Sequence, residues 1–232
     1  MHTPDLLILL VLAAGAAASA HWKKLTPAAA LTGGIIGALV YAGSSYTGLL
    51  LLALFFILGT AATSWKKKEK SRIKGNAAHQ PTRNTGQVIA NGGVAAILGA
   101  LAALIPADRS LFSLLLAASL SSATADTLSS ELGMIYGRRH FNILTGKQDT
   151  RGLDGVISLE GLLIGLAGSA VIAAAYGRSF FIILLAGLIG NLADSFLGAT
   201  LERKGALSND AVNFLNTAIA ALAAGALIGF KP

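Results

Sequence analysis

The 232-residue sequence contains no cysteine and is poor in charged and aromatic side chains. Without cysteine, a disulfide-stabilised secreted fold, a cysteine-bound metal and a thiol nucleophile are all excluded. Charged residues make up 12% of the chain, about half of the share found in soluble globular proteins. Hydrophobic residues make up 54%, and there are 27 glycines. Apolar segments rich in small residues are typical of membrane-spanning helices that pack closely, so the composition predicts an all-α, polytopic transmembrane bundle.

Apolar segments follow one another along the whole chain, so residues 1–232 are expected to form a single transmembrane domain. Each segment is long enough, or nearly long enough, to cross a bilayer as a helix. The eight segments are about 4–20, 27–43, 47–64, 87–105, 110–133, 155–176, 179–201 and 209–230. The second and third flank a short link at 43–46, and a re-entrant or tilted helix there would leave six or seven spans.

The basic residues predict the orientation of these spans. If the N-terminus lies outside, all of the 18 Lys and Arg residues except Arg109, Arg178 and Lys231 lie on the cytoplasmic side. Two long loops, about 65–86 and 134–154, then also face the cytoplasm. The net charge of +7 would suit nucleic acid, but the positive residues sit in loops between apolar segments, where they anchor the protein at anionic lipid. We therefore expect the cytoplasmic membrane as location and no nucleic-acid partner.

Acidic and amide side chains within the apolar segments share one depth. A carboxylate inside a membrane span costs about 2.5–3.5 kcal/mol on insertion scales, so each is a functional candidate. Neighbouring spans run in opposite directions, which places the whole set roughly 5–15 Å below the cytoplasmic surface. The set comprises Asn91, Asp126, Glu131, Glu160, Asn191, Asp194, Glu202, Asn213 and Asn216. The layer predicts a site that opens to the cytoplasm; a structural polar network or a proton path is the competing interpretation.

Oxygen ligands, with no cysteine in the chain and no histidine in the spans, favour Mg²⁺ over zinc. We expect Asp126, Glu131 and Asp194 to bind Mg²⁺, with Glu160 as a further ligand or as the partner of Lys147. Mg²⁺ commonly bridges substrate phosphates, and nearby basic residues would bind the remaining phosphate charge. The candidates for binding phosphate or nucleotide are Arg83, Asn84, Asn91, Arg138, Arg139, Lys147 and Asn213. For the asparagines, helix capping and interhelical hydrogen bonds are the alternative roles.

Four ordered motifs, at residues 83–93, 125–133, 155–161 and 194–202 with 212–213, resemble the integral-membrane phytyl-phosphate kinase family. A more distant similarity to dolichol and phytol kinases involves 137–139, Lys147 and 160–161. The resemblance implies transfer of a phosphoryl group from a nucleoside triphosphate, often CTP, to an isoprenyl monophosphate in the membrane, giving the diphosphate. The family's acidic and amide positions map to Asn91, Asp126, Glu131, Glu160, Asp194 and Asn213.

Two other functions meet many of the same physical requirements. A cytidylyltransferase that joins CTP to a lipid phosphate needs the same carboxylates and cation, and differs in which phosphorus atom is attacked. An ion-coupled transporter also uses buried carboxylates and glycine-broken helices, but it requires polar groups near the middle of the membrane with access to both sides. The outer halves of these spans are nearly devoid of ionisable groups, which disfavours a transporter.

Overall fold

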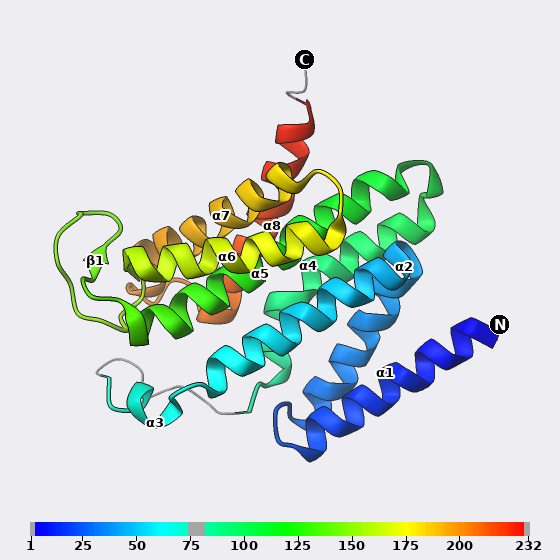
Figure 1. The fold of residues 1–232 in the computed structure, drawn as a ribbon, viewed down its shortest axis with the longest axis horizontal. Helices are drawn as coiled ribbons and strands as arrows, with labels where there is room; N and C mark the ends of the chain where they lie inside the picture. The colour runs from blue at the N-terminus through cyan, green and yellow to red at the C-terminus, as the bar shows by residue number, and fades with distance from the viewer. Residues whose placement is uncertain (1–2, 74–81, 230–232) are drawn as a thin grey trace.

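The computed structural model describes residues 3–73 and 82–229, and helices dominate it (Figure 1). The prediction of an all-α bundle is confirmed. The α-helices are α1 (Thr3–His21), α2 (Pro27–Ser64), α3 (Lys67–Lys70), α4 (Thr85–Leu104), α5 (Arg109–Tyr136), α6 (Leu159–Tyr176), α7 (Phe180–Leu197) and α8 (Asn209–Gly229). The remaining elements are a 3₁₀ turn η1 (Pro106–Asp108), a π-helical turn η2 (Gly198–Glu202) and the short antiparallel strands β1 (Phe141–Asn142) and β2 (Val156–Ile157).

Each of the eight apolar segments expected from the sequence corresponds to a helix or a helical arm, although the sixth was expected to begin at 155 and α6 begins only at Leu159, after the strand β2. Within the described residues, six helices are long and apolar enough to cross a membrane, namely α2, α4, α5, α6, α7 and α8. Helix α1 is a shorter apolar helix, and its large side chains Leu7 and Leu10 are exposed on the surface of the protein. The chain is therefore a polytopic helical membrane protein.

Helix α2 reverses its direction at Ser45. This residue has φ 51° and ψ −146°, which interrupts the helical backbone. A straight helix of 38 residues would be about 57 Å long, yet Lys24, just before α2, donates a hydrogen bond to Ser64 at its end (3.1 Å). The arms 27–44 and 46–64 therefore run antiparallel (Figure 1), and the second and third segments expected from the sequence are two separate helical arms.

Side-chain caps define where the helices next to the polar layer begin. Asn84 accepts a hydrogen bond from the backbone N–H of Gln87 (2.9 Å), and the Gln87 side chain accepts one from the backbone N–H of Asn84 (3.1 Å). This reciprocal capping box satisfies two amide groups at the start of α4. Ser158 caps α6 in a similar way by accepting from the N–H of Gly161 (3.1 Å). Both helices thus start at a fixed residue.

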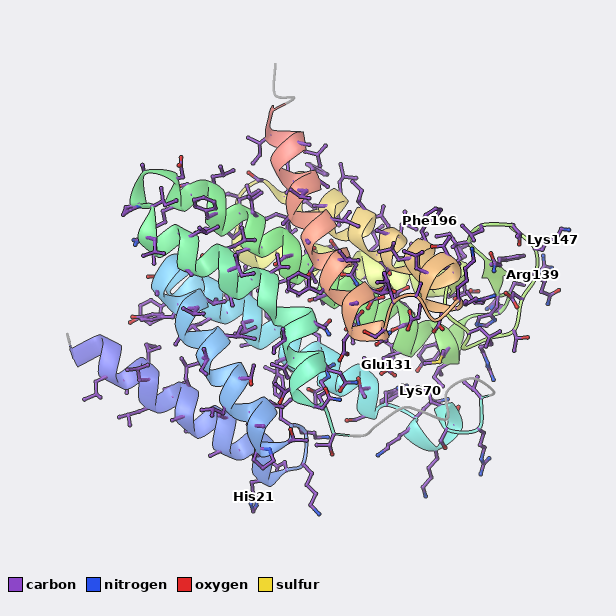
Figure 2. The ribbon with its side chains drawn as sticks, turned by 180° about the vertical axis from the view of Figure 1, so that it is seen from behind. His21, Lys70, Glu131, Arg139, Lys147 and Phe196 are labelled. Atoms are coloured by element: carbon purple, nitrogen blue, oxygen red, sulfur yellow. The ribbon has the colours of Figure 1, made fainter. Side chains whose placement is uncertain are left out.

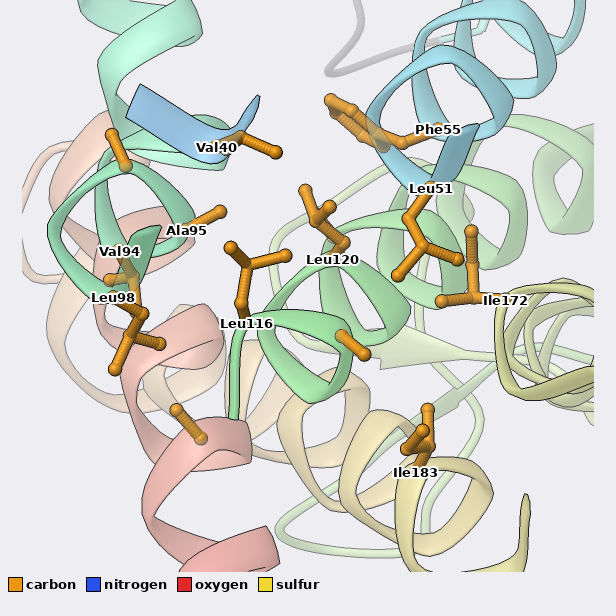
Figure 3. Close-up of a cluster of buried hydrophobic side chains, with 14 of the residues drawn as sticks. Val40, Leu51, Phe55, Val94, Ala95, Leu98, Leu116, Leu120, Ile172 and Ile183 are labelled. Carbon is orange, nitrogen blue, oxygen red and sulfur yellow. The ribbon is translucent and has the colours of Figure 1, made fainter. Parts of the chain in front are cut away.

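Helix α5 forms the centre of the bundle and packs against α2, α4, α6, α7 and α8. Its side chains Leu116 and Leu120 are fully buried and lie among Leu51, Ile172 and Ile183 from three other helices (Figure 3). Because this apolar core fixes α5 against all of its neighbours, the polar side chains at the C-terminal end of α5 have a defined position.

Small residues allow the other helices to approach α5 closely. A Cβ atom on Gly165 of α6 would lie 2.8 Å from the carbonyl oxygen of Ala125. Buried hydroxyl groups link the same helices, since Ser121 of α5 and Ser169 of α6 are hydrogen-bonded at 2.6 Å. Close backbone packing and interhelical hydrogen bonds are the main attractive forces between helices in a membrane, where apolar burial gives little.

The glycine contact between α2 and α4 gives a test of this packing. A Cβ on Gly99 would lie 2.6 Å from the backbone oxygen of Leu39, so Gly99→Ala must separate the helices and should cost on the order of 1–3 kcal/mol. At Gly34, no atom of the described residues lies within 4 Å of the corresponding Cβ, and Gly34→Ala should be neutral or stabilising by up to about 1 kcal/mol. Thermal unfolding in detergent compares the two variants, and equal midpoints would contradict the close contact.

Candidate active site

Two carboxyl groups from different helices meet at one end of the bundle. Asp126 of α5 and Asp194 of α7 lie within hydrogen-bonding reach of each other. The side chain of Asn213 on α8, with its amide nitrogen turned toward them, lies 3.3 Å from Asp126 Oδ2 and 3.2 Å from Asp194 Oδ2. Three helices thus bring oxygen and amide groups to one point. This was expected from the common depth in the membrane predicted for these residues.

A buried asparagine positions one of these carboxylates. The amide nitrogen of Asn216 on α8 donates to Asp194 Oδ2 at 2.7 Å, and its amide oxygen accepts from the Ser122 hydroxyl of α5 at 3.0 Å. Asn216 is fully buried, so both of its bonds are shielded from water. This chain of bonds from α5 through α8 to α7 fixes the orientation of Asp194.

The carboxylates line a pocket of about 280 Å³. Its wall comes from the start of α4, the C-terminal part of α5, the loop that carries β1 and β2, the end of α7 with η2, and the start of α8. Six of the residues predicted for the site line this pocket, namely Arg83, Asn91, Asp126, Glu131, Asp194 and Asn213. These six residues therefore share one cavity, which agrees with the common depth in the membrane predicted for them.

The other predicted site residues lie outside the pocket lining. Asn84 uses its side chain to cap α4. Glu160, at the start of α6, accepts from the backbone N–H of Arg138 (3.2 Å) and lies 3.9 Å from its Nε. Arg138, Arg139 and Lys147 are exposed, and Figure 2 shows Arg139 and Lys147 at the outer edge of the molecule. This structure thus places the loop cations away from the cavity.

Glu131 is charge-compensated by a lysine from a distant part of the sequence. Lys70 Nζ lies 2.6 Å from Glu131 Oε2, and the lysine side chain is 1% exposed. The same ammonium group donates to the carbonyl oxygens of Ala62 (2.7 Å) and Thr63 (3.0 Å) at the end of α2. Figure 2 shows the two side chains close together below the bundle. This ion pair argues against Glu131 as a metal ligand and for a role in attaching α3 to α5.

The four carboxylates predicted to bind Mg²⁺ do not form a single cluster. Within residues 3–73 and 82–229, no three Asp, Glu or His side chains gather into a group that could hold a metal ion. Asp126 and Asp194 are adjacent, whereas Glu131 pairs with Lys70 and Glu160 lies beside Arg138. Of the four predicted ligands, Asp126 and Asp194 are therefore the two that lie together.

Arg83 is the one lysine or arginine among the described residues that line the pocket. Its guanidinium group lies 5.7 Å from the ring centre of Phe55, and a Cβ on Gly59 would lie only 2.9 Å from it. Burial lowers the pKa of Arg83 and the charge of Glu131 opposes this change, but an arginine remains protonated in such surroundings. Arg83 therefore provides a fixed positive charge in a pocket that is otherwise rich in carboxylates.

The π-helical turn η2 places one further carboxylate in the pocket. The backbone N–H of Arg203 donates to the carbonyl oxygen of Gly198, five residues earlier (3.1 Å), which defines the wider turn. Glu202 at its end lines the pocket. Turns of this type occur frequently at functional sites.

The loop between α5 and α6 forms one wall of the pocket and is attached to η2. Arg203 Nη1 donates to Asp149 Oδ2 at 3.0 Å, and its Nε donates to the carbonyl oxygen of Asp154. Hydrogen bonds from the Thr150 backbone, Asn142 and Arg203 lower the pKa of Asp149. Asp154 itself lines the pocket, and partial burial raises the pKa of its carboxyl group.

Several lining residues were not among those predicted for the site. They include Gln87, His140, Asp154, Asn191, Glu202 and Asn209. Glu202 and Asn191 had both been placed in the polar layer but were not selected as site residues, although Asn191 lies one helical turn before Asp194. Asp154 and His140 are in a loop, where no periodic pattern indicates which side chains face inward.

Comparison with known proteins gives the family. The sequence matches the family described as integral membrane protein DUF92 over residues 9–221. The chain belongs to this DUF92 family. An uncharacterized membrane protein of Methanocaldococcus jannaschii is 35% identical, over 82% of this chain and 77% of that protein. No solved structure matches the chain.

Two further relatives come from photosynthetic organisms. An uncharacterized membrane protein of Synechocystis sp. is 32% identical, over 90% of this chain and 85% of the relative. Protein VTE6, chloroplastic, of Arabidopsis thaliana is also 32% identical, over 82% of this chain and 61% of the plant protein. The described membrane bundle of this DUF92 protein is thus similar to most of the length of the microbial relatives and to a part of the plant one.

The Lys70–Glu131 pair of this DUF92 protein should be important for stability. Lys70→Met removes the ammonium group that lies 2.6 Å from the buried Glu131 carboxylate, and breaking a buried ion pair costs about 3–5 kcal/mol. Adding Glu131→Gln removes that charge, so the double variant should unfold at a higher temperature than Lys70→Met alone. Lys68→Met, on an exposed side chain of the same helix, is the matched control and should match the parent. Additive effects of the two changes would show that the pair is not coupled.

Proposed function

We propose that this protein is a lipid-phosphate kinase and that the pocket around Asp126 and Asp194 is its active site. It transfers a phosphoryl group from a nucleoside triphosphate, CTP by resemblance, to an isoprenyl monophosphate of the phytyl or geranylgeranyl type. The observation that carries the proposal is the charge of the pocket. Among the described residues, five carboxylates and a single guanidinium line it, and Glu131 is the one of these carboxylates that pairs with a described lysine. Such a cavity accepts phosphates only together with cations.

The residues of the pocket fit Mg²⁺. This ion is typically held by one or two carboxylates and completes its shell with waters and substrate phosphate oxygens. Asp126 and Asp194 supply the carboxylates, and Thr127 and Ser195, which carry hydroxyl groups, line the same cavity. We propose these residues as the site for Mg²⁺. When bound, the ion would neutralise charge on the transferred phosphoryl group.

The side chains of the pocket would mainly position the two substrates. An oxygen of the lipid monophosphate attacks the γ-phosphorus, the bond from that phosphorus to the β,γ-bridging oxygen breaks, and the nucleoside diphosphate leaves. The acceptor oxygen is already ionised at neutral pH, so no strong general base is needed. In this proposal Arg83 binds phosphate oxygens, and Asn91, whose amide nitrogen also donates to the carbonyl oxygen of Gln87, donates a second hydrogen bond to them. Asn216 keeps Asp194 in its orientation throughout.

The location of the pocket supports an enzyme over a transporter. Its lining residues come from one end of the bundle, at the start of α4 and α8 and the end of α5 and α7. A transporter instead places its site near the middle of the membrane, between two alternating entrances. The basic loops at this end favour the cytoplasmic side. A lipid phosphate would enter from the bilayer and the nucleotide from the cytoplasm.

A product assay tests the proposal. Purified protein in lipid vesicles is incubated with geranylgeranyl monophosphate, Mg²⁺ and CTP labelled at the γ-phosphorus. Labelled lipid diphosphate with CDP is the expected result. Lipid-linked CMP with released diphosphate would identify a cytidylyltransferase, and no turnover with any of the common nucleoside triphosphates would contradict a kinase.

The aspartate pair should be essential for this activity. Asp126→Asn and Asp194→Asn each retain the shape of the side chain but remove a charge that the cation requires, so turnover should fall by about 10²-fold or more. Asp108→Asn changes an exposed aspartate in η1 and should leave turnover unchanged. Thermal unfolding confirms that all three variants are folded. Turnover in Asp126→Asn within a few-fold of the parent would rule out the role given to this residue.

Arg83 should affect the binding of phosphate more than the fold. Arg83→Gln removes the guanidinium group, and the loss of a charged hydrogen bond of about 1.5–3 kcal/mol predicts kcat/KM lower by roughly 10- to 150-fold. Arg83→Lys should restore only part of this, because an ammonium cannot make the two parallel bonds of a guanidinium. Steady-state kinetics over both substrates measures the effect. Full activity of the lysine variant would argue against a bidentate phosphate contact.

A further inference from the structure

A second cavity, of about 390 Å³, lies on the other side of Thr63 from the aspartate pocket. It is formed by the turn between α1 and α2, the end of α2, the helix α3 and residue 82. Its lining consists of Trp22, Lys23, Lys24, Thr63, Ser64, Lys67 and Thr82. In Figure 2, His21 at the end of α1 and the helix α3 lie along the same lower edge of the molecule. None of the residues that line this cavity belongs to the sequence motifs that resemble the kinase family.

The charge of this cavity is opposite to that of the aspartate pocket. Three lysines line it, and none of the described residues in its wall is acidic. Lys24 donates to the Ser64 hydroxyl at 3.1 Å, while Lys23 and Lys67 form no ion pair with a described carboxylate. The hydroxyl groups of Thr63 and Ser64 add further hydrogen-bond donors. Ammonium and hydroxyl donors without a carboxylate suit an anion with several oxygens, such as a phosphate.

Backbone hydrogen bonds hold the wall of this cavity in place. The N–H of Arg83 donates to the carbonyl oxygen of Lys24, and the N–H of Thr26 donates to that of Arg83, both at 3.0 Å. The Thr82 hydroxyl donates to the carbonyl oxygen of Lys23 at 2.9 Å. Lys23 also has a positive φ of 53°, an unusual backbone conformation for a lysine. The lysines are therefore carried by a defined turn that pairs with the segment before α4.

The position of the cavity indicates a ligand from the bilayer. Trp22 is 70% exposed at its rim, directly after the apolar helix α1. Tryptophan and lysine at the ends of apolar helices are typical of the level of the lipid headgroups. We infer that this cavity binds the phosphate headgroup of an anionic membrane lipid. The site is separate from the aspartate pair and does not depend on the proposed kinase activity.

Fluorescence of Trp22 can report on this lipid directly. The chain has two tryptophans, so a Trp65→Phe parent leaves Trp22 as the single reporter. The parent is placed in mixed vesicles of phosphatidylcholine and phosphatidylglycerol in which either one or the other lipid is brominated, at equal mole fractions. Brominated phosphatidylglycerol should quench Trp22 several-fold more strongly than brominated phosphatidylcholine, because the anionic lipid is enriched at the cavity.

A matched pair of variants separates a defined site from general attraction to anionic lipid. Lys23→Gln with Lys67→Gln should abolish the preference for phosphatidylglycerol. Lys68→Gln with Lys204→Gln removes the same charge from exposed side chains outside the cavity. This variant should retain the preference for phosphatidylglycerol. Both double variants should unfold at the temperature of the parent, since none of these four lysines is buried.

Three results would overturn the inference. Equal quenching of Trp22 by both brominated lipids in the parent would overturn it before any lysine variant is measured. An equal loss of preference in both double variants would show that diffuse surface charge attracts the lipid. If inorganic diphosphate reduced the quenching of Trp22, and if both brominated lipids quenched Trp22 equally, the cavity would bind a soluble phosphate instead of a lipid headgroup.

Discussion

The close approach of two carboxyl groups, Asp126 and Asp194, is the constraint around which this end of the bundle is organised. Like charges at such a distance repel each other, so they must be held by the protein and compensated by a cation or a proton. Glycines and serines let α5 and α7 approach, and Asn213 and Asn216 of α8 place amide groups against the carboxylates. An apolar core nearer the N-terminal end of α5 fixes the helices. The packing energy of the bundle therefore stabilises a pair of carboxyl groups whose proximity is unfavourable by itself.

Charge is divided between two neighbouring cavities. The aspartate pocket is acidic and contains the single guanidinium of Arg83, whereas the cavity at the end of α1 is basic. The backbone of Arg83 pairs with the turn that forms the basic cavity, while its side chain reaches into the acidic one. The short segment before α4 therefore connects both cavities. A phosphate in the acidic pocket would face carboxylates and one guanidinium, whereas a phosphate in the basic cavity would face lysines.

The sequence predicted the helical architecture, the positions of the apolar segments and the common depth of the polar residues. These features follow from composition and from a rise per residue that is the same in every helix. Depth alone does not give the rotation of a helix about its axis. This is why Glu160, at the correct depth, lies outside the pocket, whereas Asn191 lines it.

The role of Glu131 could not be predicted for a different reason. Its partner Lys70 lies 61 residues away in the sequence, in a run of lysines that otherwise resembles an ordinary anchor at the membrane surface. The loop cations that were predicted to bind phosphate likewise do not line the pocket. Arg138, Arg139 and Lys147 are expected on this side of the membrane for reasons of topology, and that requirement by itself gives no information about ligands.

The π-helical turn η2 has a consequence for the comparison of family members. A turn of this kind contains one residue more than a regular α-helical turn. The wider turn accommodates this extra residue, so deleting a single residue between Gly198 and Glu202 would restore regular α-helical geometry and leave the residues that follow on the same face of the helix. A relative with a one-residue gap at this point would therefore still present a glutamate aligned with Glu202 to the pocket.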